Sequence, residues 1–147
     1  MKATAVAHPN IALVKYWGKR DDALNLPAVP SLSLTLGGFV TTTTVTWGAA
    51  SDRFRLDGRE ADADEARKVF ALLDRIDPNR PRCDVESQND FPTAAGLASS
   101  SSGFAALAVA GAAAAGVDLD PTAFLDADTT ATTSATSQCS GPATGRP

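Results

Sequence analysis

The chain has 147 residues and a formal net charge of −4, with 13 Lys and Arg against 17 Asp and Glu. Without a long basic stripe, this balance argues against nucleic acid or an anionic membrane as a partner. The apolar run at residues 3–7 stops at His8-Pro9, so it is too short for a signal sequence or a membrane span. Cys83 and Cys139 lack the spacing of a zinc or redox motif. We therefore expect a cytoplasmic protein, and no residue is predicted as a metal ligand.

The first third of the chain predicts β-structure. Residues 2–7 and 11–17 are rich in β-branched, aliphatic and aromatic side chains, which is typical of strands. Residues 31–36 alternate strictly, so Leu32, Leu34 and Leu36 are expected to face a core. The intervening Ser31, Ser33 and Thr35 would face away from the core or toward a ligand. Gly37-Gly38 predicts a tight hairpin turn into a strand over residues 39–47.

The middle of the chain predicts more strands and two helices. A short strand at 53–56 ends at Asp57-Gly58, a type I′ turn signal. Residues 61–76 have apolar side chains at helical spacing, and residues 83–87 resemble one more strand. The Ala-rich run at 104–115 is a strong helix former. Together these patterns predict an antiparallel sheet covered by helix.

The loop at residues 91–103 has the features of a phosphate-binding turn that opens a helix. Gly96 interrupts regular structure, and the four serines at 99–102 offer hydroxyls and capping groups. The first turn of a helix has unpaired N–H groups and the positive end of the macrodipole, so it favours an anion. The segment is neither a Walker A loop nor a Gly-x-Gly-x-x-Gly motif. On composition alone a Ser-rich cap on a buried Ala helix is favoured over a nucleotide site.

A second segment, far upstream, favours the phosphate interpretation. Lys15 interrupts the apolar face of a predicted strand, and Lys19 and Arg20 crowd the end of that strand. A single lysine would fit a strand end with its ammonium group in solvent. Three adjacent cations repel one another, and an anionic ligand would relieve that repulsion. His8 stands alone before a proline, and we predict a structural role for it.

The last residues have a different composition. Residues 129–147 contain no Leu, Ile, Val, Phe, Tyr or Trp, and almost half of them are Ser or Thr. Such a segment cannot bury enough apolar surface to offset its ordering entropy. We therefore expect a folded domain at residues 1–125 and a low-complexity tail at 126–147 that is disordered or the product of a frameshift.

The two segments together resemble the diphosphomevalonate decarboxylases of the GHMP kinase superfamily. The resemblance covers residues 2 to about 125 and rests on long motifs in the right order. They are Pro9-Asn10-Ile11-Ala12, Lys15-Tyr16-Trp17-Gly18-Lys19-Arg20-Asp21, Leu24-Asn25-Leu26-Pro27 and Asn89-Asp90-Phe91-Pro92-Thr93-Ala94-Ala95-Gly96-Leu97-Ala98-Ser99-Ser100. It implies an α/β fold, an α+β sandwich of the GHMP kinase N-terminal type. The sheet would be mixed but mostly antiparallel, with helices on one side.

The resemblance also implies a reaction and a set of site residues. The family uses ATP and Mg²⁺ to phosphorylate mevalonate 5-diphosphate and then expels phosphate and carbon dioxide, giving isopentenyl diphosphate. Lys15 would be the catalytic lysine. The substrate would be bound by Asn10, Tyr16, Trp17, Gly18 and Lys19, and the ATP phosphates by Gly96, Ala98, Ser99 and Ser100. The small-molecule substrate would be the main partner, and a homodimer is conceivable.

The sequence also departs from the family pattern. A later Ser-Gly-Ser-Ala-Cys-Arg segment and a catalytic aspartate are missing, and no acidic residue follows Asp128. We therefore expect the isolated chain to be inactive. Two alternatives stay open, namely a non-catalytic fragment that binds nucleotide weakly or not at all, and a related enzyme such as a mevalonate kinase or a phosphomevalonate decarboxylase.

Overall fold

A computed structural model of the chain describes residues 1–14, 18–21, 26–28, 32–92 and 99–117. The predicted tail and the residues around Leu125 lie outside this part. The strands are β1 (Lys2–Ala7), β2 (Asn10–Val14), β3 (Lys19–Asp21), β4 (Leu26–Pro27), β5 (Leu32–Thr35), β6 (Thr41–Trp47), β7 (Arg53–Leu56), β8 (Arg59–Glu60) and β9 (Cys83–Asn89). The helices are α1 (Ala63–Ile76) and α2 (Ser99–Ala115).

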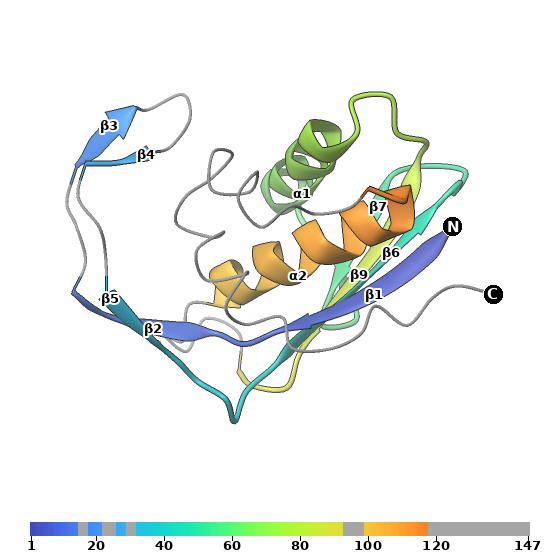
Figure 1. Cartoon of the computed structure of the whole chain (residues 1–147). Coiled ribbons are helices and arrows are strands. Elements are labelled where there is room, and N and C mark those ends of the chain that lie inside the picture. Colours follow the sequence, from blue (N-terminus) through green and yellow to red (C-terminus); the bar gives the residue numbers. More distant parts are fainter. Residues whose placement is uncertain (15–17, 22–25, 29–31, 93–98, 118–147) are drawn as a thin grey trace.

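The main sheet has five strands in the order β1-β6-β9-β7-β8. All pairs are antiparallel except β7 with β9, which is parallel. In β6 every second side chain is buried, and these side chains face the helices that cover one side of the sheet (Figure 1). The predicted α/β fold with a mixed, mostly antiparallel sheet is therefore confirmed.

Helix α1 begins two residues after the predicted start because a capping box fixes it there. The Asp62 side chain accepts a hydrogen bond from the Glu65 N–H at 2.8 Å, and the Glu65 carboxylate accepts one from the Asp62 N–H at 3.1 Å. Val69 and Leu73 form its buried face. The helix ends at Ile76, shortly before Pro78, as predicted.

After its four opening serines helix α2 is apolar, and it lies on β1 and β6 beside α1. Its end forms a Schellman motif, in which Gly116 has φ = +71° and the Val117 N–H donates to the Ala112 carbonyl at 3.0 Å. Close packing with α1 depends on Gly111, because a Cβ at this position would lie 2.6 Å from the Leu73 Cδ2 atom. The C-terminal half of α2 thus packs closely against α1.

An ion pair secures the far end of the sheet. The Arg80 guanidinium is 7% exposed and lies over the rings of Trp47 and Phe70, 5.8 and 5.4 Å from their centroids. It donates to Asp52 at 2.8 Å and to Asp74 at 2.7 Å. Burial alone would raise the pKa of Asp52, but hydrogen bonds from Arg80, the Arg82 side chain and the Cys83 N–H outweigh it and hold that pKa well below its usual range.

Strands β2 and β5 form a separate two-stranded ribbon, and its strand pairing differs from the prediction. β5 pairs with β2, and β6 belongs to the main sheet, so the predicted hairpin through Gly37-Gly38 is wrong. A turn does form there, with the Phe39 N–H donating to the Leu36 carbonyl at 3.2 Å. Leu32 and Leu34 are 60% and 57% exposed, so the prediction that they face a core is also wrong. Figure 1 shows the ribbon, and the β3–β4 pair beyond it, projecting from the main sheet.

The described residues contain no helix that combines the length and apolar character needed to cross a bilayer.

Candidate functional site

The first turn of α2 is a suitable place for an anion. The helix has 17 residues, and no acidic residue lies in its first turn. Ser100 is exposed at this end and Ser99 is partly exposed, so N–H groups and hydroxyls are presented together. The structure thus supports the predicted helix opening at Ser99 and Ser100, although the preceding loop residues Gly96 and Ala98 lie outside the described part.

A chain of hydrogen bonds holds this turn against the sheet, and its link between Ser102 and Thr41 is buried. The Ser102 and Thr41 hydroxyls are 2.7 Å apart, and the Thr41 hydroxyl donates to the Asn89 Oδ1 atom at 2.6 Å. The Asn89 amide in turn donates to Asp57 at 3.3 Å, and its backbone N–H donates to the same carboxylate at 2.8 Å. The Ser102 hydroxyl also lies 3.1 Å from the Ser99 carbonyl oxygen, a second acceptor for its single hydrogen. The chain therefore runs from the helix to a carboxylate in the β7–β8 turn.

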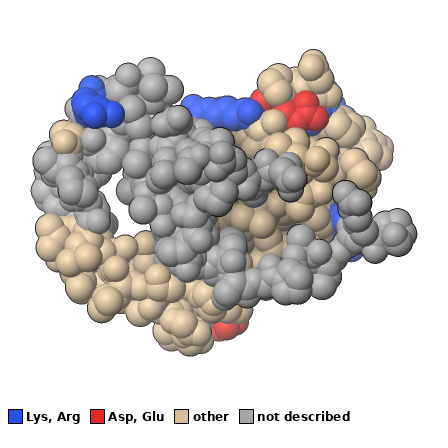
Figure 2. Space-filling view, viewed as in Figure 1, with Lys and Arg blue, Asp and Glu red and all other residues tan. Residues whose placement is uncertain are grey.

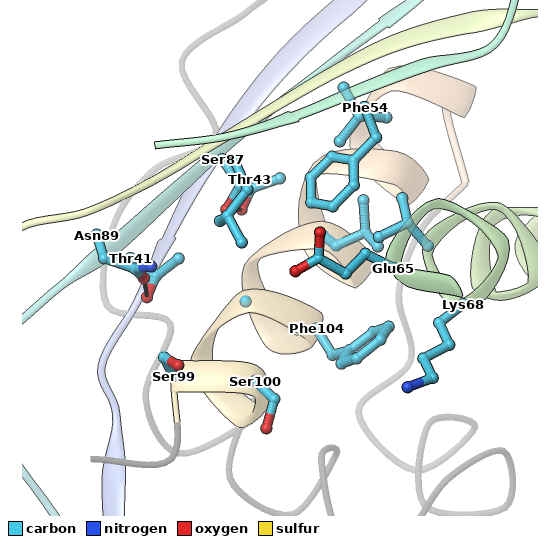
Figure 3. Close-up of a pocket in the computed structure, with 15 residues that line it drawn as sticks. Thr41, Thr43, Phe54, Glu65, Lys68, Ser87, Asn89, Ser99, Ser100 and Phe104 are labelled. Carbon is cyan, nitrogen blue, oxygen red and sulfur yellow. Dashed lines mark hydrogen bonds between the residues drawn. The ribbon is translucent and has the colours of Figure 1, made fainter. Parts of the chain in front are cut away.

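A cavity of about 230 Å³ lies between the sheet and the two helices and reaches Ser99 and Ser100 (Figure 3). The sheet contributes four polar side chains that form two cross-strand pairs, Thr41 with Asn89 and Thr43 with Ser87. The Thr43 and Ser87 hydroxyls are 2.9 Å apart. Phe104 of α2 and apolar side chains make up most of the remaining wall. A cavity of this volume can hold only a part of a nucleotide, because pockets that enclose a whole ligand as large as a nucleotide have larger volumes.

Two charged side chains of α1 border the cavity. The Arg59 guanidinium binds the Glu65 carboxylate through two hydrogen bonds of 2.7 and 2.9 Å and lowers its pKa. Glu65 is therefore a paired anion and repels a second anion only weakly. Lys68 extends from α1 along the edge of the pocket past Phe104 (Figure 3). The cavity thus has cationic character at its edge.

Asn10 joins the upstream segment to the start of α2. The Ser101 hydroxyl donates to the Asn10 Oδ1 atom at 3.2 Å, and the Asn10 Nδ2 group donates to the Ser33 hydroxyl at 3.2 Å. Residues 91 positions apart in the sequence therefore meet. This contact is the observation that unites the two predicted parts of the site.

Of the other predicted substrate residues, the structure describes only Gly18 and Lys19, which lie just before β3 and at its start. Gly18 has φ = +114°. In Figure 1, β3 stands apart from both helices. Lys15, Tyr16 and Trp17 lie outside the described residues. His8 lies close to the Phe39 carbonyl, with its Nδ1 atom 2.8 Å from the oxygen, which fits a structural role.

Sequence reasoning missed the sheet side of the site. Thr41, Thr43, Ser87 and Asn89 were interpreted only as strand residues or as part of a motif. One signal was present, because Thr41 and Thr43 repeat with the period of two that places side chains on the same face of a strand. That face is buried here, and buried polar side chains need hydrogen-bond partners because their desolvation is otherwise costly.

Comparison with known proteins identifies the family. A family model described as the diphosphomevalonate decarboxylase-like N-terminal domain matches residues 7–143. The chain is 42% identical over 126 residues to a diphosphomevalonate decarboxylase of Aspergillus fumigatus, with 72% of the chain and 31% of the relative covered. It is 40% identical over 124 residues to a phosphomevalonate decarboxylase of Haloferax volcanii, with 81% and 38% covered.

A solved structure has the same fold. The mevalonate diphosphate decarboxylase of Enterococcus faecalis, studied for its mevalonate diphosphate-mediated ATP binding, superimposes with a TM-score of 0.75 at 45% identity, and the match covers 82% of this chain and 39% of that one. The chain thus spans between 31% and 39% of the length of these relatives. Both upstream and downstream motifs fall within the matched residues. The chain belongs to the diphosphomevalonate decarboxylase-like family, of which it contains the N-terminal domain.

Proposed function

We propose that this chain forms the nucleotide-binding part of an ATP-dependent decarboxylase that converts mevalonate 5-diphosphate to isopentenyl diphosphate. The observation that carries the proposal is the meeting of Asn10 with Ser101, because it joins the predicted substrate segment to the predicted phosphate turn. ATP phosphates would lie at the N-terminus of α2, against Ser99 and Ser100. Gly96 and Ala98 of the preceding loop would complete the phosphate site.

The cavity beside α2 supports this assignment. It opens next to Ser99 and Ser100, and its apolar wall ends in polar side chains of the sheet. Such a pocket suits the base and sugar of a nucleotide whose phosphates lie at the helix end. The absence of an acidic residue in the first turn of α2 agrees with a polyphosphate at that place.

The second ligand, mevalonate 5-diphosphate, would lie along the upstream segment at residues 10–20. Two polyanions must approach each other during phosphoryl transfer, so their repulsion has to be cancelled by cations and oriented N–H groups. Lys15 would supply positive charge near the transferring phosphate. Tyr16, Trp17, Gly18 and Lys19, with Asn10, would bind the diphosphate.

Magnesium fits the site as a companion of the nucleotide. In the described part of the chain, no cluster of three acidic, His or Cys side chains could hold a metal ion by itself. Mg²⁺ keeps several waters and is commonly bound through substrate phosphates, so it would arrive with ATP. When bound, it would neutralise charge on the phosphates, and the hydroxyls of Ser99 and Ser100 would help to hold it.

The reaction itself needs more than this chain. The relatives are more than twice as long, and the sequence lacks the aspartate and the Ser-Gly-Ser-Ala-Cys-Arg segment that the family pattern adds later. We therefore expect purified chain to bind ATP·Mg²⁺ but to release no carbon dioxide from mevalonate 5-diphosphate. A release that depends on ATP and disappears in Lys15→Ala would contradict this expectation.

The substrate could instead be the monophosphate. The match to the Haloferax volcanii phosphomevalonate decarboxylase is nearly as strong as the match to the diphosphate enzymes. Calorimetric titration of the chain with mevalonate 5-diphosphate and with mevalonate 5-phosphate separates the two. We expect the diphosphate to bind more tightly, because the cations at Lys15, Lys19 and Arg20 favour the more highly charged ligand.

A further inference from the structure

The Asn10 amide is held from two sides. On one side Ser33 of the neighbouring strand accepts a hydrogen bond from Nδ2, and on the other side Ser101 of α2 donates to Oδ1, both at 3.2 Å. Asn10 lies opposite Thr35 in the β2–β5 register, and Ser33 lies opposite Ala12, so all four side chains share one face of the ribbon. This polar face lies toward α2, whereas Ile11 and Leu34 occupy the opposite, apolar face.

An asparagine that binds an anion works best when its amide is already fixed. A diphosphate offers only acceptor oxygens, so the amide must present an Nδ2 hydrogen other than the one donated to Ser33, and turn its oxygen away. An amide that rotates freely loses conformational entropy when the ligand binds, which weakens binding. A hydroxyl that donates to Oδ1 prevents this loss by holding the oxygen on the helix side.

We infer that Ser101 is a positioning residue for Asn10, which it orients for the diphosphate group of the substrate. This inference rests on the proposed function, because it assumes a diphosphate ligand beside Asn10. It assigns to Ser101 a role different from that of Ser99 and Ser100, which face the nucleotide. It also makes the α2 turn a structural link between the two ligands.

The neighbouring serine provides a matched comparison. Ser102 is fully buried and belongs to the hydrogen-bond chain through Thr41, so its hydroxyl anchors the helix to the sheet. Ser101 is only partly buried. Removal of the Ser102 hydroxyl should therefore lower the melting temperature, whereas removal of the Ser101 hydroxyl should leave it nearly unchanged.

Four versions of the full-length chain test the inference: wild type, Ser101→Ala, Ser101→Thr and Ser102→Ala. The first measurement needs no ligand and records the side-chain amide signals of Asn10 by ¹⁵N NMR, assigned with Asn10→Asp. We expect Ser101→Ala to shift these signals and to speed their hydrogen exchange, and Ser101→Thr to restore them. Unchanged Asn10 signals in Ser101→Ala would overturn the inference, whether or not any ligand binds.

The second measurement is calorimetric titration with mevalonate 5-diphosphate and, separately, with ATP·Mg²⁺. We expect Ser101→Ala to lower the affinity for mevalonate 5-diphosphate by about three- to tenfold, while the affinity for ATP·Mg²⁺ changes less than twofold. An equal loss of affinity for both ligands, or an unchanged affinity for mevalonate 5-diphosphate, would show that Ser101 does not act through Asn10. Wild-type chain that binds no mevalonate 5-diphosphate would instead refute the proposed function, and the NMR result would still decide whether Ser101 holds Asn10.

Discussion

Substitution of Gly111 by alanine tests how closely α1 and α2 are packed. Alanine in a helix interior is favoured over glycine by about 1 kcal/mol, so a stabilised protein would be the naive expectation. The new Cβ would, however, lie 2.6 Å from Leu73 Cδ2 and 3.4 Å from Ile76 Cδ1. Leu73 is fully buried, so its side chain can give way only by shifting against packed neighbours. Overpacking of this kind costs about 1–3 kcal/mol, so we expect Gly111→Ala to be destabilised by up to about 2 kcal/mol.

Gly103 is the matched control in the same helix, because a Cβ there meets no atom within 4 Å. Gly103→Ala should therefore gain about 0.5–1 kcal/mol. The propensity terms cancel between the two variants, so their stabilities should differ by about 1–3 kcal/mol, the overpacking term alone. Urea denaturation followed by circular dichroism, without ligand, measures this difference. Equal stability of the two variants would refute the close contact between the helices.

Three further predictions concern the Asp52 ion pair, the buried thiol and the exposed ribbon. Asp52→Asn should cost about 3 kcal/mol because it leaves the Arg80 cation poorly paired. The folded-state pKa of Asp52 is lowered, so its contribution to the free energy of unfolding is present above about pH 4 and is lost as the pH falls further. In urea titrations between pH 3 and 7, the free energy of unfolding of Asp52→Asn should therefore depend less on pH than that of the wild type. Burial raises the pKa of Cys83 to about 12, so its thiol should react with iodoacetamide at pH 8 only when the protein unfolds. The Cys139→Ser variant leaves Cys83 as the single thiol for this test, and fast labelling of the folded variant would contradict the prediction. The apolar face of the ribbon should promote self-association of the wild-type chain, so light scattering should find Leu34→Lys more nearly monomeric. An unchanged mass distribution would locate the contact elsewhere.

Features with a local cause could be predicted from the sequence. The type I′ turn forms at Asp57 and Gly58 as expected, with φ of 50° and 80°, because few residues other than Asp, Asn and Gly adopt that conformation readily. Helix α1 follows its apolar spacing in the same way. The strand partner of β5, in contrast, depends on contacts distant in sequence. Gly37 and Gly38 form a turn, but neither has the positive φ of a primed hairpin turn, and the chain passes from the ribbon to the main sheet.

The candidate site was predictable to a similar degree. Asn10, Ser99 and Ser100 could be found because they lie in contiguous motifs. The buried partners of the helix start, Thr41 and Asn89, come from two different strands, and their role follows only from the register that pairs them. The direct contact of Asn10 with Ser101 likewise needs the fold that brings the ribbon and α2 together.

The central claim is that the N-terminus of α2 holds the phosphates of a nucleotide, and calorimetric titration of the folded, full-length chain with ATP·Mg²⁺ tests it most directly. We predict saturable binding to one site that is weakened in Ser100→Asp, because a carboxylate in the first turn would repel the phosphates. A folded chain that gives no binding heat at millimolar nucleotide would contradict the claim.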